Sequence, residues 1–155
     1  MRSLLKSIGS DERHRYSGRF IKYGFKYDDR NKRHAKPTMI LKDIRLFDEN
    51  VEGHIVAEHL WLNLTLGFKE LGILEENDIV CFNGRVASYE KGYYLDKITV
   101  DYKLERPTKI ELVSLEDNTQ RKQWEGKDWE ICNKIWGMYS YYNEKGIHQP
   151  YPDLW

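Results

Sequence analysis

The order of secondary-structure signals along the chain constrains its fold more than any other feature. Five segments are rich in β-branched and aromatic residues and end at polar turns, as strands do; they cover residues 16–26, 38–47, 54–64, 79–89 and 93–102. Between the third and fourth segments, Phe68, Leu71 and Leu74 recur three positions apart, which is typical of one helical face. Pro107 separates the fifth segment from a further extended run over residues 109–115. The sequence therefore predicts three strands, a short helix and two more strands.

That order is the chain order of the five-stranded Greek-key barrel called the OB-fold. Residues 78–86, Asp-Ile-Val-Cys-Phe-Asn-Gly-Arg-Val, resemble the fourth-strand entry of OB domains, where an acidic turn precedes alternating core residues. Residues 19–107 also resemble small OB-like proteins of bacterial phages and mobile elements, a likeness that brings no assigned activity. The resemblance implies a nucleic-acid-binding-like domain that is mainly β with α: a five-stranded OB-type Greek-key barrel with a C-terminal helical extension.

A chain of 155 residues fits one domain with appendages. We assign residues 1–14 to a flexible basic arm, residues 15–115 to the barrel, and residues 116–155 to an aromatic helical tail with an extended C-terminus. The chain carries no net charge, yet residues 1–37 hold eleven Lys or Arg against four Asp or Glu. Such asymmetry indicates a basic region that meets a polyanion, and a solvated N-terminus explains it equally well.

Strand alternation predicts which side chains of the third strand face outward. One face carries leucines at positions 60, 62 and 64, and the opposite face carries His59, Trp61 and Asn63. The leucines belong to the core, so Trp61 is expected on the outside. The same alternation in the second strand assigns Ile40, Ile44 and Leu46 to the core and Leu41, Asp43 and Arg45 to the outside.

An outward tryptophan among cationic side chains is typical of a surface that binds single-stranded nucleic acid. An aromatic ring stacks on any base, Lys and Arg contact phosphates, and OB barrels bind oligonucleotides on the exterior of strands two and three. We therefore predict single-stranded DNA or RNA as the partner, bound by Trp61, His59, Asn63, Arg45, Lys22, Lys26, Arg30, Lys32, Arg33 and Lys36. Two alternatives stay open: Trp61 lies beneath a C-terminal helix, or Asp43 forms a cross-strand ion pair that only fixes the register.

The tail supports a second hypothesis, a protein-interaction module. Residues 118–144 read as helical, and one helical face collects Trp129, Cys132, Trp136 and Tyr139. This face is expected to dock on the barrel or on a second copy of the chain in a homodimer. The aromatic members of the face, together with Trp155, are assigned to partner binding. In this hypothesis the barrel and tail bind a nucleic-acid-processing enzyme, as a mobile-element inhibitor does.

The sequence lacks the motifs of common enzymes. It contains no Gly-rich phosphate loop and no nucleophile elbow, and its histidines and cysteines lack metal-ligand spacing. We therefore predict no catalytic residue, no metal and no cofactor. No stretch approaches the ~20 apolar residues that span a bilayer, so no membrane partner is expected. Two distant cysteines, Cys81 and Cys132, do not indicate a disulfide scaffold, which favours a cytoplasmic location.

Overall fold

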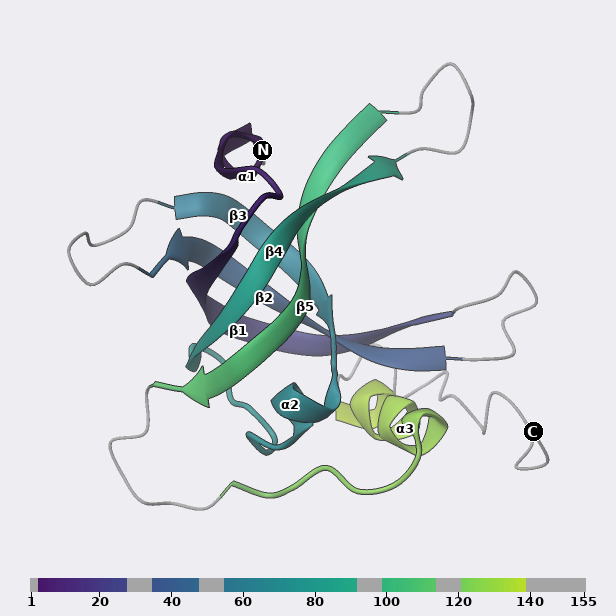
Figure 1. The fold of residues 1–155 in the computed structure, drawn as a ribbon. Helices are drawn as coiled ribbons and strands as arrows, with labels where there is room; N and C mark the ends of the chain where they lie inside the picture. The colour runs from purple at the N-terminus through teal and green to yellow at the C-terminus, as the bar shows by residue number, and fades with distance from the viewer. Residues whose placement is uncertain (1–2, 28–34, 48–54, 92–98, 114–120, 139–155) are drawn as a thin grey trace.

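The protein is built on one antiparallel sheet of five strands in the order β3-β2-β1-β4-β5 (Figure 1). This computed structural model describes residues 3–27, 35–47, 55–91, 99–113 and 121–138. The strands are β1 (Arg13–Tyr27), β2 (Ala35–Leu46), β3 (Ile55–Asn63), β4 (Ile79–Lys91) and β5 (Thr99–Leu112). The helices are α1 (Ser3–Ile8), α2 (Leu66–Lys69) and α3 (Asp128–Met138). The prediction of a mainly β chain with five strands and a short helix after the third is confirmed.

The longest strand, β1, is shared by both halves of the sheet. Its first part, Arg13–Arg19, pairs with β4, and Tyr16–Tyr27 pairs with β2. The β1–β2 ladder has register shifts between Ser17 and Arg19 and between Phe20 and Lys22. Because such irregularities bend and twist a strand, the sheet curls and its two edges, β3 and β5, approach each other. Within the described residues, no ladder joins these edges.

The concave side of the curled sheet encloses the hydrophobic core. Every strand contributes buried side chains to it, among them Tyr16, Leu41, Leu60, Phe82 and Leu104. The helix α2 adds Phe68, which is fully buried and lies edge-on to Phe82 with 5.8 Å between the ring centroids. Burying one large apolar side chain contributes about 1.5–3 kcal/mol, so this shared core fixes which face of each strand points inward.

The N-terminal residues that were assigned to a flexible basic arm include a short helix. Residues 3–8 form α1, and Leu5 is 0% exposed within the core. Ile8, three positions later, is partly buried against the same core, so both side chains lie on one face of the helix. Burial of this face places α1 against β3, β4 and β5. The sequence did not predict this helix because three apolar residues, Leu4, Leu5 and Ile8, in a polar stretch give a weak periodic signal.

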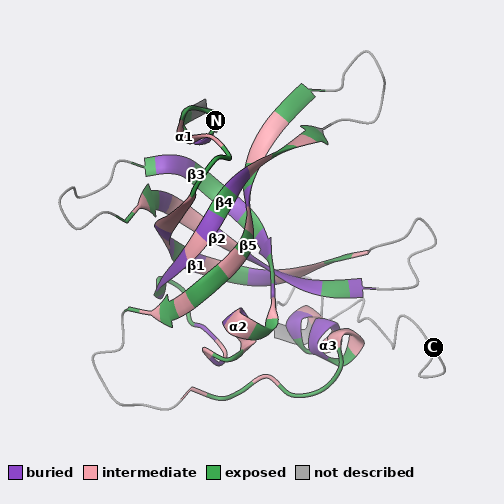
Figure 2. Cartoon of the chain, viewed as in Figure 1, coloured by how far each residue is buried: buried purple, intermediate pink, exposed green. Residues whose placement is uncertain are grey.

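The helix α3 docks on the chain's own sheet. It packs against β1 and β2 (Figure 1) and buries Ile131, Cys132 and Ile135 on that side. Figure 2 shows this buried stripe on α3 beside the intermediate and exposed residues of its other sides. Of the two predicted docking modes, the structure shows the intramolecular one.

Candidate functional site

Trp61 of β3 points away from the core. Its side chain is 48% exposed, whereas its neighbours Leu60 and Leu62 are buried. The predicted outward orientation of Trp61 is therefore confirmed. The alternative position beneath the C-terminal helix is wrong, because α3 packs against β1 and β2 and makes no contact with β3 in the part of the chain that is described.

The Trp61 ring crosses β2 and reaches β1. A Cβ atom placed on Gly24 of β1 would lie 2.9 Å from Cζ3 and 3.1 Å from Cη2 of Trp61. Between them, Thr38 of β2 is only 6% exposed although its side chain faces outward. Real Cβ contacts are not this short, so the ring can take this position only because residue 24 has no side chain. The Trp61 ring thus lies across three strands with part of its surface open to solvent.

The residues around Trp61 form rows that follow the register of β1, β2 and β3. Arg19, Lys42 and His59 are aligned in one row, and Lys22, Ile40 and Trp61 in the next. The third row contains Gly24, Thr38 and Asn63, and the fourth pairs Lys26 with Lys36. We call this surface the basic face; it consists of Arg19, Lys22, Gly24, Lys26, Lys36, Thr38, Ile40, Lys42, His59, Trp61 and Asn63. It holds five Lys or Arg and no carboxylate.

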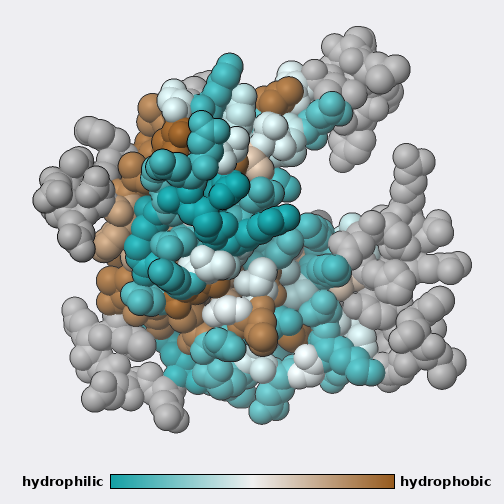
Figure 3. All heavy atoms as spheres, viewed as in Figure 1, coloured by the Kyte–Doolittle hydropathy of each residue, from teal (hydrophilic) through white to brown (hydrophobic). Residues whose placement is uncertain are grey.

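Cations on the basic face differ in their surroundings from those on β4 and β5. On that other side, Arg15 forms a 3.1 Å salt bridge with Glu111, and the front of β4 and β5 is hydrophilic (Figure 3). On the basic face, no salt bridge joins Arg19, Lys22 or Lys26 to another described residue. The carboxylates Asp43 and Glu58 lie past the Lys42–His59 row, between that row and the Ile44–Ala57 pair. The basic face therefore ends at an acidic border.

The structure brings together some of the predicted nucleic-acid-binding residues. Six of them lie on the basic face: Trp61, His59, Asn63, Lys22, Lys26 and Lys36. Arg45 does not, because it pairs with Ile55 and lies five positions along β2 from Ile40, a separation of about 17 Å. Three more, Arg30, Lys32 and Arg33, fall outside the described residues.

The assignment of core and outward residues in β2 needs correction. Met39 and Leu41 are buried, and Ile40, predicted to be in the core, is partly exposed beside Trp61. Ile44 is buried as predicted. Ile40 and Ile44 face opposite sides of the sheet because Asp43 has a φ of 51° and interrupts the alternation between Leu41 and Ile44. One alternation of inward and outward side chains, applied to the whole strand, cannot describe this irregularity.

Two cations of the basic face, Arg19 and Lys42, were missed. In a regular strand Arg19 and Lys22 would face opposite sides, and only the register shift between Phe20 and Lys22 brings both outward. Lys42 was missed because the parity error in β2 placed its side of the strand inward. The apolar pair Met39 and Leu41 was the sequence signal for the correct orientation of Lys42. The spacing of this pair indicates a core face as well as the spacing of Ile40 and Ile44 does.

The C-terminal aromatic residues do not form an open surface on α3. Trp136 packs against Phe25 of β1 with 4.9 Å between the ring centroids. Trp129 is partly buried, and Tyr139 and Trp155 lie outside the described residues. Assignment of these residues to a protein partner stays a prediction, since packing against β1 already explains the position of Trp136.

The described residues show no arrangement typical of metal binding. Among them, no three His, Cys, Asp or Glu side chains cluster as metal ligands do. Burial raises the pKa of Cys81, and it raises the pKa of Cys132 to about 12 with the Asp128 carboxylate adding to the effect. Neither thiol is therefore a ready thiolate nucleophile near neutral pH. No helix within the described ranges is long and apolar enough to cross a membrane.

Comparison with known proteins assigns no family to the chain. No family model, curated protein or solved structure matches the chain. Among the described residues, the basic face combines an exposed aromatic ring with a group of positively charged side chains.

Proposed function

We propose that the chain binds single-stranded nucleic acid on the basic face, with one base stacked on Trp61 and phosphates contacted by the surrounding lysines and arginine. The supporting observation is the position of an exposed indole at the centre of five cations, with no carboxylate among the described residues that make up the basic face. A base stacked on an aromatic side chain contributes about 1–3 kcal/mol, and cations that meet phosphates release counterions. The indole thus matches the base of a nucleotide, and the cations match its phosphate.

The dimensions of the basic face favour a single strand that follows the direction of β2. Lys36 and Lys42 lie six positions apart, which separates their backbones by about 20 Å. Trp61 and Ile40 lie between these two cationic ends. An unpaired strand can present a base to Trp61 while its phosphates reach both ends. Bases inside a duplex are stacked on each other and are not free to stack on the indole.

We further propose that the curled sheet is an OB-type barrel whose edges stay apart. Three features support this: the chain order of strands and α2, the spatial order β3-β2-β1-β4-β5, and the approach of β3 to β5. OB-folds are partly open five-stranded barrels that bind oligonucleotides on the exterior of strands two and three. The basic face occupies that position, with β1 as its third strand.

The test is a titration of the full chain against fluorescently labelled oligonucleotides, monitored by anisotropy. Single-stranded DNA and RNA of about 12 nucleotides, within the site sizes of about 4–16 nucleotides known for OB barrels, are compared with duplexes of the same sequence. We expect single strands to bind more tightly than duplexes. Trp61→Ala should weaken binding by about 1–3 kcal/mol, the stacking contribution of one base.

Matched controls separate the basic face from a general surface effect. Val100→Ala removes a side chain that is 60% exposed on β5, a strand that carries none of the basic face, and should leave the affinity unchanged. Lys42→Ala should reduce the salt dependence, whereas Lys103→Ala on β5 should not. The slope of log affinity against log salt is about −0.7 for each phosphate contacted by a single strand. Binding that is independent of salt and unchanged by Trp61→Ala would exclude the proposal.

A further inference from the structure

The part of β1 that carries the basic face extends beyond the rest of the sheet. The β1–β4 ladder ends at Arg19, and β3 accompanies β2 only as far as the Thr38–Asn63 pair. The Leu64 amide still donates a 3.0 Å hydrogen bond to the Pro37 carbonyl, so the last pairs, Lys26–Lys36 and Tyr27–Ala35, form a two-stranded hairpin. Such a hairpin is marginally stable unless something packs against it. Figure 1 shows α3 beneath this projecting end of β1 and β2.

The inner side of this hairpin is held by aromatic contacts from the C-terminal part of the chain. Tyr23 lies edge-on to Trp124 with 4.9 Å between the ring centroids, and Phe25 packs on Trp136 at the same distance. We call residues 121–136 the C-terminal brace. Tyr23 and Phe25 point inward, and they alternate along β1 with the outward Lys22, Gly24 and Lys26. The brace therefore contacts the reverse side of the residues that carry the basic face.

The brace is also fixed to the rest of the domain at its beginning. Arg121 forms a 2.6 Å salt bridge with Asp78, and both side chains are largely buried. The Asp78 carbonyl accepts a 2.7 Å hydrogen bond from the Phe20 amide, so this ion pair adjoins the point where β1 leaves β4. In addition, the Ile73 amide donates to the Lys122 carbonyl at 2.8 Å.

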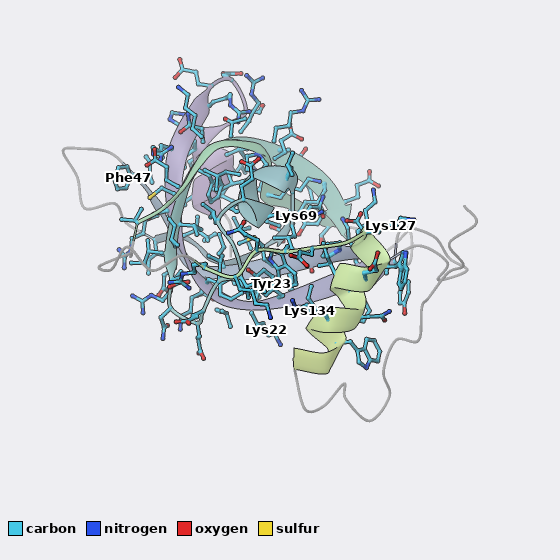
Figure 4. All side chains as sticks on the ribbon, turned by 90° about the horizontal axis from the view of Figure 1, so that it is seen from below. Lys22, Tyr23, Phe47, Lys69, Lys127 and Lys134 are labelled. Atoms are coloured by element: carbon cyan, nitrogen blue, oxygen red, sulfur yellow. The ribbon has the colours of Figure 1, made fainter. Side chains whose placement is uncertain are left out.

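The hydroxyl of Tyr23 connects the same strand to the segment after α2. It accepts a 2.7 Å hydrogen bond from the Leu74 amide and is buried. Figure 4, seen from below, labels Lys22 and Tyr23 on β1 and Lys134 on α3; the Lys134 ammonium lies 5.7 Å from the centre of the Trp124 ring. The inward neighbour of Lys22 is thus held by a hydrogen bond and by an aromatic contact.

We infer that the C-terminal brace positions the basic face, with Trp124 and Trp136 as positioning residues, so that nucleic-acid binding and docking of the brace are coupled. This inference rests on the proposed function. A ligand that bridges β1 and β2 needs Lys22, Lys26 and the Trp61–Gly24 contact in one arrangement, and the brace favours that arrangement. Because linkage is reciprocal, a bound strand must in turn stabilise the docked brace.

Three variants of the full chain test the inference. Trp136→Ala removes the ring that packs on Phe25, and Trp136→Phe keeps an aromatic contact there. Tyr102→Ala removes a comparable, partly buried side chain from β5, away from the hairpin. We expect Trp136→Ala to weaken binding of labelled single-stranded DNA about fivefold or more, the lower end of typical coupling between linked sites. Trp136→Phe should restore the affinity, and Tyr102→Ala should leave it unchanged.

Hydrogen–deuterium exchange gives a readout that a merely structural role would not change. Saturating oligonucleotide should slow amide exchange in residues 128–138 of the wild-type chain and have a smaller effect in Trp61→Ala at equal concentration. If β1 and β2 are protected while α3 exchanges as before, the brace is not coupled to the basic face and the inference fails, although the proposed function stands. If no oligonucleotide binds the wild-type chain, the proposed function and this inference both fail.

Discussion

Replacement of Gly24 by alanine tests whether the position of the Trp61 ring matters for binding. The added Cβ would lie 2.9 Å from the ring, and carbon contacts settle at about 3.5–4.0 Å, so the ring must retreat by roughly 0.5–1 Å. Because Trp61 is half exposed, it can move outward without disturbing the core. The φ of Gly24 is not in the left-handed region, so alanine brings no backbone strain there.

The expected effects on stability and affinity differ in size. Alanine inside a strand is favoured over glycine by roughly 0.5–1 kcal/mol, which offsets the lost packing of the ring, so the free energy of unfolding should change by less than about 1 kcal/mol. A displaced ring loses part of a stacking contribution of about 1–3 kcal/mol. A loss of roughly 1 kcal/mol corresponds to about fivefold weaker binding of single-stranded nucleic acid.

A double-mutant cycle with Trp61→Ala shows whether the effect passes through the indole. Affinity is measured by anisotropy and stability by urea denaturation, for both single variants and the double variant. Gly84→Ala is the matched control, because a Cβ at this strand glycine meets its nearest neighbour at an ordinary 3.5 Å. Gly24→Ala should weaken binding in the wild-type chain and have no further effect once Trp61 is alanine. Equal weakening in both backgrounds would refute the reasoning.

Three further predictions concern stability. Tyr16→Phe should raise the free energy of unfolding by about 1 kcal/mol in urea titrations, since the hydroxyl of Tyr16 is buried without a hydrogen-bond partner among the described residues. Burial raises the pKa of the Cys132 thiol from 9.0 to about 12, so the folded state favours the neutral thiol. The stabilising contribution of this thiol is complete below pH 9.0 and decreases as pH rises toward about 12. Urea midpoints measured across this range should fall less steeply for Cys132→Ala. Asp78→Asn should lower the free energy of unfolding by about 3 kcal/mol because Arg121 stays buried without its carboxylate, whereas Glu111→Gln, at an exposed salt bridge, should cost less than about 1 kcal/mol.

Local alternation predicted the orientation of β3 because that part of the strand is regular. Leu60 and Leu62 are buried and Trp61 is exposed, as their parity requires. The same rule failed in β2, where Asp43 adopts a left-handed backbone conformation. The sequence of β2 allows either of the two alternating sets of side chains to face the core. Only pairing with β1 and β3 decides which set does so. Regular strands can be oriented from sequence, and strands with bulges cannot.

The end of β5 shows a second limit of local signals. Pro107 was expected to separate two extended segments, yet β5 continues through it from Thr99 to Leu112. Arg106 and Lys109 adopt φ values of 52° and 50°, and the β4–β5 ladder is irregular beside them. Proline is tolerated at an edge strand and at bulges because neither position needs its missing amide hydrogen. The sequence marked the irregularity correctly and could not show that the pairing resumes after it.

The least predictable part of the site was the packing beneath it. Trp124 and Trp136 read as an aromatic stripe that could meet any apolar surface, and their positions against Tyr23 and Phe25 depend on contacts over about one hundred residues of sequence separation. Helical periodicity identifies a face that must be buried. It does not identify the surface that buries it.

The proposed binding of a polyanion does not require a net positive charge on the whole chain. Charges interact strongly only within a Debye length of about 10 Å at ~0.1 M salt, whereas the two ends of the basic face lie about 20 Å apart. A phosphate beside Lys22, in the same row as Ile40 and Trp61, therefore experiences the nearest cations far more than carboxylates on β5, of which Glu111 is already paired with Arg15. For binding on this surface, the positions of the cations on β1 and β2 matter more than the sum of charges over the whole chain.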